Sequence, residues 1–420
     1  MFKKSLKKSG RMLTFALALC VLAACLPGFP TANADNTLPE FVKIADNLYE
    51  TTYTTDYDWS DTATPDLIGF ACSAVQNGQY RGRNYDWTYA DTDLCIVHTT
   101  VTENRPHASV AVSDMSFIRN ADGTYNYEKV PFTTVDGIND AGVCIQVNVM
   151  PYGENGVLNH TEATDDDLPG SRVVRFVLDY AASVEDAIEL LIERDIHSEM
   201  GTGNELHWML SGPASKTDST IKTVVIEVFP DGLHITENFV DDKPIMTNFN
   251  VSNFDGTKES VGTGAGYERW ELLDKYYDQA DSVMGTFDLM EKVFYSKTYD
   301  LYGESFWYSE FGNFDLAPYY SADELKNILG EDVYNSYIEK YGSVYYLPDL
   351  WDGEKVLNGD ISKAGILAPV VEDFIGKYNA QNMEDGSLWI TIHTSVYDLE
   401  NLTLDIQVRE SQDHLHFTIS

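Results

Sequence analysis

The chain has 420 residues, of which 43% are hydrophobic and 12% aromatic, so it can bury a sizeable core in one large domain or two ordinary ones. Its formal net charge is −39, from 67 acidic and 28 basic residues. A surface this acidic repels the phosphates of nucleic acids and of anionic lipids, which argues against a nucleic-acid-binding protein.

The first 34 residues are typical of an export signal. A basic stretch, residues 3–11, precedes an apolar run, residues 12–24, that is too short for a permanent membrane span. Two processing sites stay open: a lipobox-like sequence ending at Cys25, which would then be lipidated, and the A-x-A sequence of residues 32–34. The lipobox is favoured because it directly follows the apolar run. We therefore expect an exported protein, extracellular or in the cell envelope, with a lipid anchor if Cys25 is modified.

Residues 35–71 are polar up to about residue 66 and are interpreted as a propeptide or linker. From residue 67 to 75 the chain turns apolar, as a buried strand does, and residues 80–87 return as its partner. Asn77-Gly78 between them is a strong hairpin signal. Cys72 therefore lies in a predicted strand.

Further elements alternate between strands and helices. Apolar residues at helical spacing predict two helices within residues 172–194, the second capped by Ser183. Strands are predicted at 94–101, 107–112, 130–135, 143–149, 208–210, 223–228, 233–237, 244–247, 387–397, 402–409 and 414–419, and helices at 267–276, 322–341 and 361–378. This order favours two packed sheets with helices outside over a parallel βαβ series. The aromatic-rich stretch 302–352 is interpreted as a packing layer, with a substrate pocket as the alternative.

Three cysteines follow the signal region: Cys72, Cys95 and Cys144. They are too few for a disulfide scaffold, and one thiol is left over even if two pair. By composition alone, each is most simply a buried small apolar residue. No Cys-x-x-Cys or paired-His pattern and no phosphate-binding glycine pattern is present, so the sequence predicts neither a metal nor a cofactor.

The surroundings of Cys72 set it apart from the other two. Cys72-Ser73-Ala74 is followed by the hairpin and then by Gly82-Arg83-Asn84-Tyr85-Asp86-Trp87. Further blocks follow in order at residues 137–151, 245–248, 262–270 and 394–398. Together they resemble the choloylglycine hydrolases and penicillin V acylases, linear-amide hydrolases of the N-terminal-nucleophile superfamily. The resemblance implies an α+β fold, a four-layer αββα sandwich over residues 72–420, with an insertion near 302–352.

The resemblance also implies the roles of individual residues. Cys72 would be the nucleophile, surrounded by Arg83, Asp86, Asn148, Asn248 and Arg269. In this superfamily the cysteine becomes the first residue of the mature chain, and its α-amine, which titrates near ~8, serves as the base, so no histidine is needed. The two Asn amides would stabilise the oxyanion, Asp86 would hold the amine, and Arg83 would lower the pKa of the thiol. Because Cys72 lies deep in the chain, the bond from Ala71 to Cys72 must first be cut, by autocatalysis.

The sequence thus predicts an exported hydrolase that cleaves linear, non-peptide amides through a thioester, such as conjugated bile acids or other N-acyl amino acids. A penicillin V or N-acyl homoserine lactone acylase is the alternative, although Asn148 is closer to the bile-salt-hydrolase residue than to the tyrosine of penicillin acylases. A papain-like hydrolase would need His and Asn partners that the sequence does not place. From another class, a lipid-anchored ligand-binding protein stays open. The expected partner is a small-molecule amide substrate, without nucleic acid and with a membrane only through the lipid anchor, and a homo-oligomer stays open.

Overall fold

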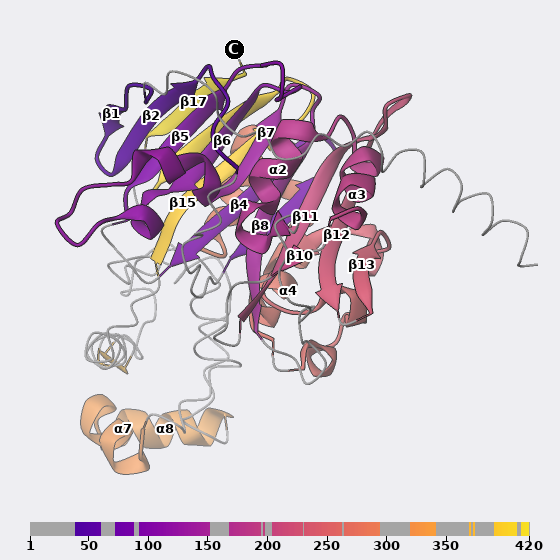
Figure 1. The fold of residues 1–420 in the computed structure, drawn as a ribbon. Helices are drawn as coiled ribbons and strands as arrows, with labels where there is room; N and C mark the ends of the chain where they lie inside the picture. Colours follow the sequence, from indigo (N-terminus) through magenta and orange to yellow (C-terminus); the bar gives the residue numbers. More distant parts are fainter. Residues whose placement is uncertain are drawn as a thin grey trace, which may run out of the picture.

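Two β-sheets lie face to face in the computed structural model, with helices on their outer faces (Figure 1). The structure describes residues 38–59, 72–87, 92–151, 168–194, 196–197, 204–229, 231–262, 264–294, 320–341, 369–370, 373, 390–409 and 413–419. The predicted signal peptide with Cys25, the residue Ala71, most of the predicted helix 361–378 and much of the stretch 302–352 lie outside these described residues. Within them, no helix is long and apolar enough to cross a membrane.

The larger sheet has nine strands in the order β1-β2-β5-β6-β7-β8-β11-β12-β13. All neighbours are antiparallel except β2 and β5, which are parallel. The central strands β5, β6 and β7 are buried along their whole length, as expected when both faces of a sheet are covered. The strands are β1 (Val42–Ala45), β2 (Leu48–Tyr53), β5 (Leu94–Thr99), β6 (Ser109–Asp114), β7 (Thr134–Asn139), β8 (Cys144–Pro151), β11 (Asn204–Ser215), β12 (Asp218–Phe229) and β13 (Gly232–Thr236).

The smaller sheet has six strands in the order β14-β3-β4-β15-β16-β17. It contains the predicted hairpin of β3 and β4: Asn77 pairs with Tyr80 across a two-residue loop in which Gly78 has φ +54°. The three C-terminal strands are also where the sequence predicts them. The strands are β14 (Ile245–Met246), β3 (Ser73–Asn77), β4 (Tyr80–Trp87), β15 (Ile390–Asp398), β16 (Thr403–Val408) and β17 (His414–Thr418), while β9 (Leu168–Pro169) and β10 (Ile196–His197) form a separate pair.

Helices complete the outer layers. On the larger sheet, α2 (Val173–Tyr180) contacts β7 and β8, and α3 (Val184–Ile192) contacts β11 and β12. On the smaller sheet, α4 (Tyr267–Lys275) contacts β3 and β14, and α5 (Val283–Glu291) contacts β4 and β15. The predicted four-layer αββα order is therefore confirmed. The Ser183 hydroxyl accepts a hydrogen bond from the Asp186 amide at 3.1 Å, as the predicted helix cap requires.

Three predicted elements differ from the structure. Cys72 was predicted inside a strand, but strand β3 begins only at Ser73. The predicted strand at 130–135 is mostly a 3-10 helix, η2 (Tyr127–Thr133), and β7 begins only at Thr134. Pro131 has no amide hydrogen for a sheet, while Val130 and Phe132 are buried, so the apolar pattern resembles a strand. The predicted helix 322–341 is divided into α7 (Ala322–Leu329) and α8 (Glu331–Tyr341) by Gly330, which has φ +82°. The other 3-10 helices are η1 (Met115–Ile118), η3 (Gly170–Arg172), η4 (Val240–Asp242), η5 (Val251–Asn253), η6 (Lys258–Val261) and η7 (Tyr277–Gln279).

The segment expected to be a propeptide or linker contributes to the fold. Strands β1 and β2 form one end of the larger sheet, and Tyr57 and Trp59 beyond them are buried in its core. The folded unit among the described residues therefore begins before Cys72, not at it. The sequence reading missed β2 because the segment around it is polar, although its Thr and Tyr residues favour a strand.

Candidate active site

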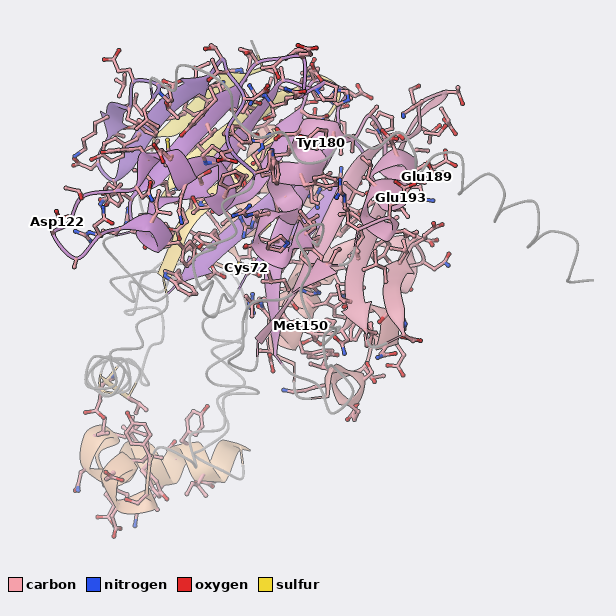
Figure 2. The ribbon with its side chains drawn as sticks, viewed as in Figure 1. Cys72, Asp122, Met150, Tyr180, Glu189 and Glu193 are labelled. Carbon is pink, nitrogen blue, oxygen red and sulfur yellow. The ribbon has the colours of Figure 1, made fainter. Side chains whose placement is uncertain are left out.

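Cys72 lies directly before β3, between the larger sheet and helix α4, and is fully buried (Figure 2). Strand β3 pairs with β14 on one side and β4 on the other, which fixes the backbone next to the cysteine. Two arginines contact Cys72, one through its side chain and one through its carbonyl.

The first arginine, Arg83, comes from β4 and points between the sheets. Its Nη2 lies 3.5 Å from the Cys72 Sγ and donates to the Val147 carbonyl at 2.8 Å. Alternation along β4 explains this direction, since odd-numbered residues face the larger sheet and even-numbered ones face α5. On the α5 side, Gly82 leaves no room for a side chain, because a Cβ there would lie 2.6 Å from the Thr286 side chain. Gly82 therefore allows close packing against α5 on one face of β4, while Arg83 contacts the Cys72 thiol on the other face.

The second arginine, Arg269, comes from α4 on the outer face of the smaller sheet. Its Nη1 donates to the Cys72 carbonyl at 2.6 Å and to the Ser73 hydroxyl at 2.8 Å, and its Nη2 donates to the Asn248 Oδ1 at 2.6 Å. The helix is preceded by Gly266 at φ +88°, where a Cβ would come within 2.5 Å of the Arg269 Nη2. Glycine at this position therefore lets the guanidinium reach under β3.

The two predicted amide residues lie on adjoining backbone segments. The Asn248 Nδ2 donates to the Val149 carbonyl of β8, and its backbone pairs with Ala265 ahead of α4. The Asn148 Nδ2 donates to the Thr247 carbonyl at 3.4 Å. Both amides therefore lie where β8 meets the end of β14, beside the residues that hold Arg83 and Arg269.

Asp86 lies near the end of β4 and is fully buried. Its Oδ1 accepts a hydrogen bond from the Thr391 hydroxyl at 2.6 Å, and its Oδ2 lies 3.9 Å from the Arg269 Nη1. Burial raises the pKa of this carboxyl to about 7, against the lowering effects of Arg269, Thr391 and Arg83. A carboxylate with this pKa changes its charge in the pH range where an enzyme of this kind would work.

The thiol itself is protonated near neutral pH in the uncut chain. Burial raises the pKa of Cys72 to about 11, although the Arg83 guanidinium acts to lower it. Burial likewise raises the pKa of the Cys95 thiol, which has no cation among the influences on it. Cys144 is also buried, with its thiol pKa raised to about 11, and it lies beside Arg81, but it is the first residue of β8 and is paired with strands on both sides. Formation of a Cys72 thiolate near neutral pH would therefore require a group that accepts the thiol proton.

Sequence reasoning did not identify the centre of the buried ionic network, Asp136 of β7. Its carboxylate pairs with Arg83 and accepts hydrogen bonds from the His393 Nε2 at 3.0 Å, the Ser395 hydroxyl at 3.1 Å and the Tyr397 hydroxyl. Burial alone would raise the pKa of Asp136, but Arg83 and His393 hold it well below its ordinary value. The signal that could have shown it is an acidic residue directly before the 137–151 block, in a stretch of apolar residues.

The structure thus brings all six predicted site residues into one connected cluster. Arg83 and Arg269 contact Cys72 directly, Asp86 and Asn248 contact Arg269, and Asn148 is next to the Val147 carbonyl that Arg83 binds. Among the described residues, no group of His, Cys, Asp and Glu side chains could hold a metal ion. The arrangement offers a thiol, two fixed cations, a titratable carboxylate and two amides, the groups that acyl transfer at a carbonyl requires.

Residues 70–261 match the family model described as linear amide C-N hydrolases, choloylglycine hydrolase family. The matched segment begins just before Cys72 and contains every predicted site residue except Arg269, which lies beyond its end. The match confirms the resemblance inferred from the sequence and the class of enzyme, a hydrolase of C–N bonds in linear amides. No curated protein matches the chain.

Three solved structures are similar to this chain at low sequence identity. A mutant of the conjugated bile acid hydrolase from Clostridium perfringens is 15% identical with a TM-score of 0.38, and the match covers 83% of this chain and 92% of that one. A second variant of that enzyme is 14% identical with a TM-score of 0.37, at the same coverage. Penicillin V acylase from Agrobacterium tumefaciens is 15% identical with a TM-score of 0.35, covering 83% of this chain and 86% of that one.

Proposed function

We propose that this chain, a hydrolase of linear amide C–N bonds by the match of its residues 70–261, uses Cys72 as an N-terminal nucleophile and passes through a thioester. The observation that carries the proposal is the position of Cys72. It precedes a strand instead of lying within one, its thiol is 3.5 Å from Arg83, and its carbonyl is held by Arg269. Neither Cys95 nor Cys144 combines these features.

The first proposed step frees the amine of Cys72. The thiol attacks the Ala71 carbonyl, the peptide C–N bond breaks, and the Ala71 acyl group passes to sulfur while the nitrogen gains the proton. Water then hydrolyses this thioester, which releases the Ala71 carboxylate and restores the thiol. Arg269 holds the Cys72 carbonyl during both events, so the nucleophile keeps its place when the chain is cut.

The second proposed step is turnover. The freed α-amine, whose ordinary pKa is ~8, accepts the thiol proton. The thiolate adds to the substrate carbonyl, and the amides of Asn148 and Asn248 stabilise the oxyanion. The C–N bond breaks, the leaving amine takes the proton, and water releases the acid from the thioester. Asp86 as a carboxylate orients the amine, and Arg83 favours the thiolate by its charge.

The proposed substrates are N-acyl amino acids, including glycine- and taurine-conjugated bile acids. The support for this choice is Asn148, which by resemblance is closer to the bile-salt hydrolases than to the penicillin acylases. We also propose that the protein is exported, which the basic and apolar stretches of residues 1–34 support.

The experiment compares wild type, Cys72→Ser and Cys95→Ala on conjugated bile acids, penicillin V and long-chain N-acyl amino acids, with the released amine as readout. Wild type and Cys95→Ala should both cleave a conjugated bile acid or another N-acyl amino acid. Cys72→Ser should lose activity by at least about 10³-fold, because the nucleophile and its base act as one unit. Full activity in Cys72→Ser would disprove the nucleophile, whereas preferred cleavage of penicillin V would overturn the proposed substrate class alone.

A further inference from the structure

We propose that residues 38–59 stay bound to the chain that begins at Cys72 after the two are separated, so that the active enzyme is a complex of two polypeptides. This inference rests on the proposed cut between Ala71 and Cys72. The surface that holds the released segment is formed by β5, η2 and α2, all of which lie after the cut in sequence.

Strand pairing is the first observation. Strand β2 pairs in parallel with β5 over its full length, from Leu48 opposite Leu94 to Tyr53 opposite Thr99. Backbone hydrogen bonds extend the ladder at both ends, from the Leu94 amide to the Asn47 carbonyl at 2.9 Å and from the Thr100 amide to the Tyr53 carbonyl at 3.1 Å. Loss of β1 and β2 would expose β5 as a bare edge of unpaired backbone groups beside a buried core.

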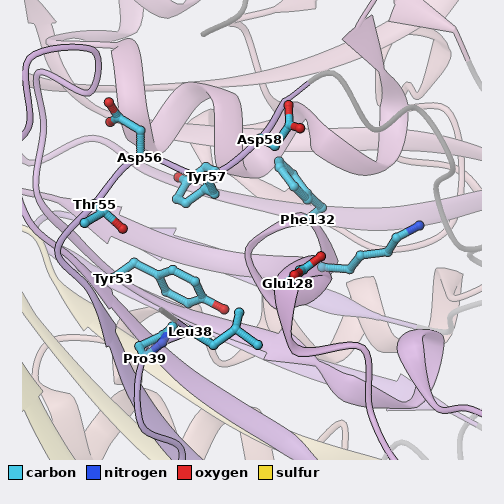
Figure 3. A pocket seen from close by; sticks show the side chains of 10 residues that line it. Leu38, Pro39, Tyr53, Thr55, Asp56, Tyr57, Asp58, Glu128 and Phe132 are labelled. Atoms are coloured by element: carbon cyan, nitrogen blue, oxygen red, sulfur yellow. The ribbon is translucent and has the colours of Figure 1, made fainter. Parts of the chain in front are cut away.

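Aromatic packing is the second observation. Tyr53, Tyr57 and Trp59 are 5%, 7% and 3% exposed. Trp59 packs edge-on against Phe132 of η2 at 5.1 Å and against Phe176 of α2 at 6.1 Å between ring centroids. Figure 3 shows Tyr53 and Tyr57 from the segment, together with Phe132 from η2, around one pocket where the segment meets η2. Buried aromatic anchors of this kind dominate the energetics of protein interfaces.

Polar contacts from the later chain hold the backbone of the segment. The Arg105 side chain donates to the Tyr53 carbonyl at 3.0 Å and to the Thr55 carbonyl at 3.2 Å. The Arg172 Nη1 donates to the Trp59 carbonyl at 2.9 Å, and the Tyr57 hydroxyl donates to Asp179 of α2. These bonds run from the region before the cut to the region after it, so none of them depends on an intact chain.

The position of the cut in the fold completes the argument. The segment before it belongs to the larger sheet, whereas β3 after it belongs to the smaller one. Cutting between them divides none of the strands in the described residues and removes none of the ladder hydrogen bonds between those strands. Each product keeps the partners that it has in the single chain, so the segment has the same surface to occupy before and after.

The test examines the purified wild-type protein as it is produced. A denaturing separation should give two polypeptides, one of them beginning at Cys72, while native mass spectrometry and gel filtration should give one complex that contains both and carries the activity. An active species that consists of the Cys72-initiated polypeptide alone would overturn the inference and leave the proposed function intact.

A protein that stays in one piece would instead contradict the proposed cut, and a second arm then decides the inference. In Cys72→Ala, a specific protease site placed between residues 60 and 71 is cut after folding. Retention of the released segment through gel filtration supports the inference, and its loss overturns it.

Variants of the segment sharpen the same experiment. In the cut protein, Trp59→Ala should release the segment at least about tenfold faster, since it removes a buried interface anchor. Val42→Ala is the matched control, because that side chain is 48% exposed on the same segment and should change the release rate little.

Discussion

Residues 38–59 and residues 72–87 are neighbours in the sequence, but different sheets and different forces hold them. The earlier region is the end of the nine-stranded sheet and is fixed by strand pairing and by aromatic rings such as Tyr57 and Trp59. The later region forms two strands of the six-stranded sheet and carries the buried charges of Arg83 on its inner face and of Asp86 beside α4.

This difference assigns separate tasks to the two regions. Burial of aromatic rings stabilises the earlier region, and this hydrophobic contribution should change little with pH. Charges buried in the later region are stable only while each has its partner, so the stability of this region should depend on pH, and in the proposed mechanism its reactivity should too. The proposed cut falls between the two, where the change of sheet leaves each region complete.

The largest effect should come from removing the charge of Asp136, which is the counter-charge of Arg83 in the later region. Asp136→Asn leaves the buried Arg83 guanidinium without its counter-charge, which should lower the free energy of unfolding by about 3–5 kcal/mol. The measurement is urea unfolding in the uncut Cys72→Ala background. Because the pKa of Asp136 is lowered in the fold, its stabilisation is present above its ordinary pKa of 3.8 and is lost as the pH falls below it.

The control for this change is Asp140→Asn, which removes a partly exposed partner of His107. That variant should lose no more than about 1 kcal/mol. Equal losses from the two variants would contradict the account of Asp136 as the counter-charge that the later region requires.

A slightly smaller effect is expected from truncating the buried side chain of Leu48 in the earlier region. This side chain of β2 is fully buried in the larger core, so Leu48→Ala should cost about 2–5 kcal/mol in the same background. Val42→Ala in β1, where the side chain is half exposed, should stay within about 0.5 kcal/mol of the parent. The gap between Leu48→Ala and the parent should be the same at pH 4 and pH 7, and a gap that changes with pH would show that ionic forces stabilise this region too.

The smallest predicted effect is a shift in the pH dependence of activity. It should follow a change next to Asp86 of the later region but not a change in the earlier region. The Thr391 hydroxyl bonds the Asp86 carboxylate and lowers its pKa, so Thr391→Val should raise that pKa above about 7. Because turnover requires the Asp86 carboxylate in the proposed mechanism, the acid limb of kcat/KM should move to higher pH by about one unit. Thr52→Val, an exposed change in β2, should leave the limb in place. A limb that does not move in Thr391→Val would exclude Asp86 as the group that controls it.

Local signals in the sequence predicted several features well, both in the later region and elsewhere in the chain. Asn77-Gly78 predicted the hairpin, Ser183 predicted a helix cap, and the motif around Cys72 led to residues that the structure brings together. The parallel pairing of β2 with β5 could not be predicted, because it joins segments some 46 residues apart and depends on the whole sheet. Asp136 was missed since an acidic residue in a strand is normally read as exposed, and its partners Arg83 and His393 come from the opposite sheet.

The most direct test of the central claim is the N-terminus of the active protein, measured by intact mass and by N-terminal sequencing of each polypeptide. The account predicts a polypeptide that begins with Cys72 and carries a free α-amine, present in wild type and absent or much reduced in Cys72→Ser. A fully active protein in which Ala71 and Cys72 are still joined would contradict it.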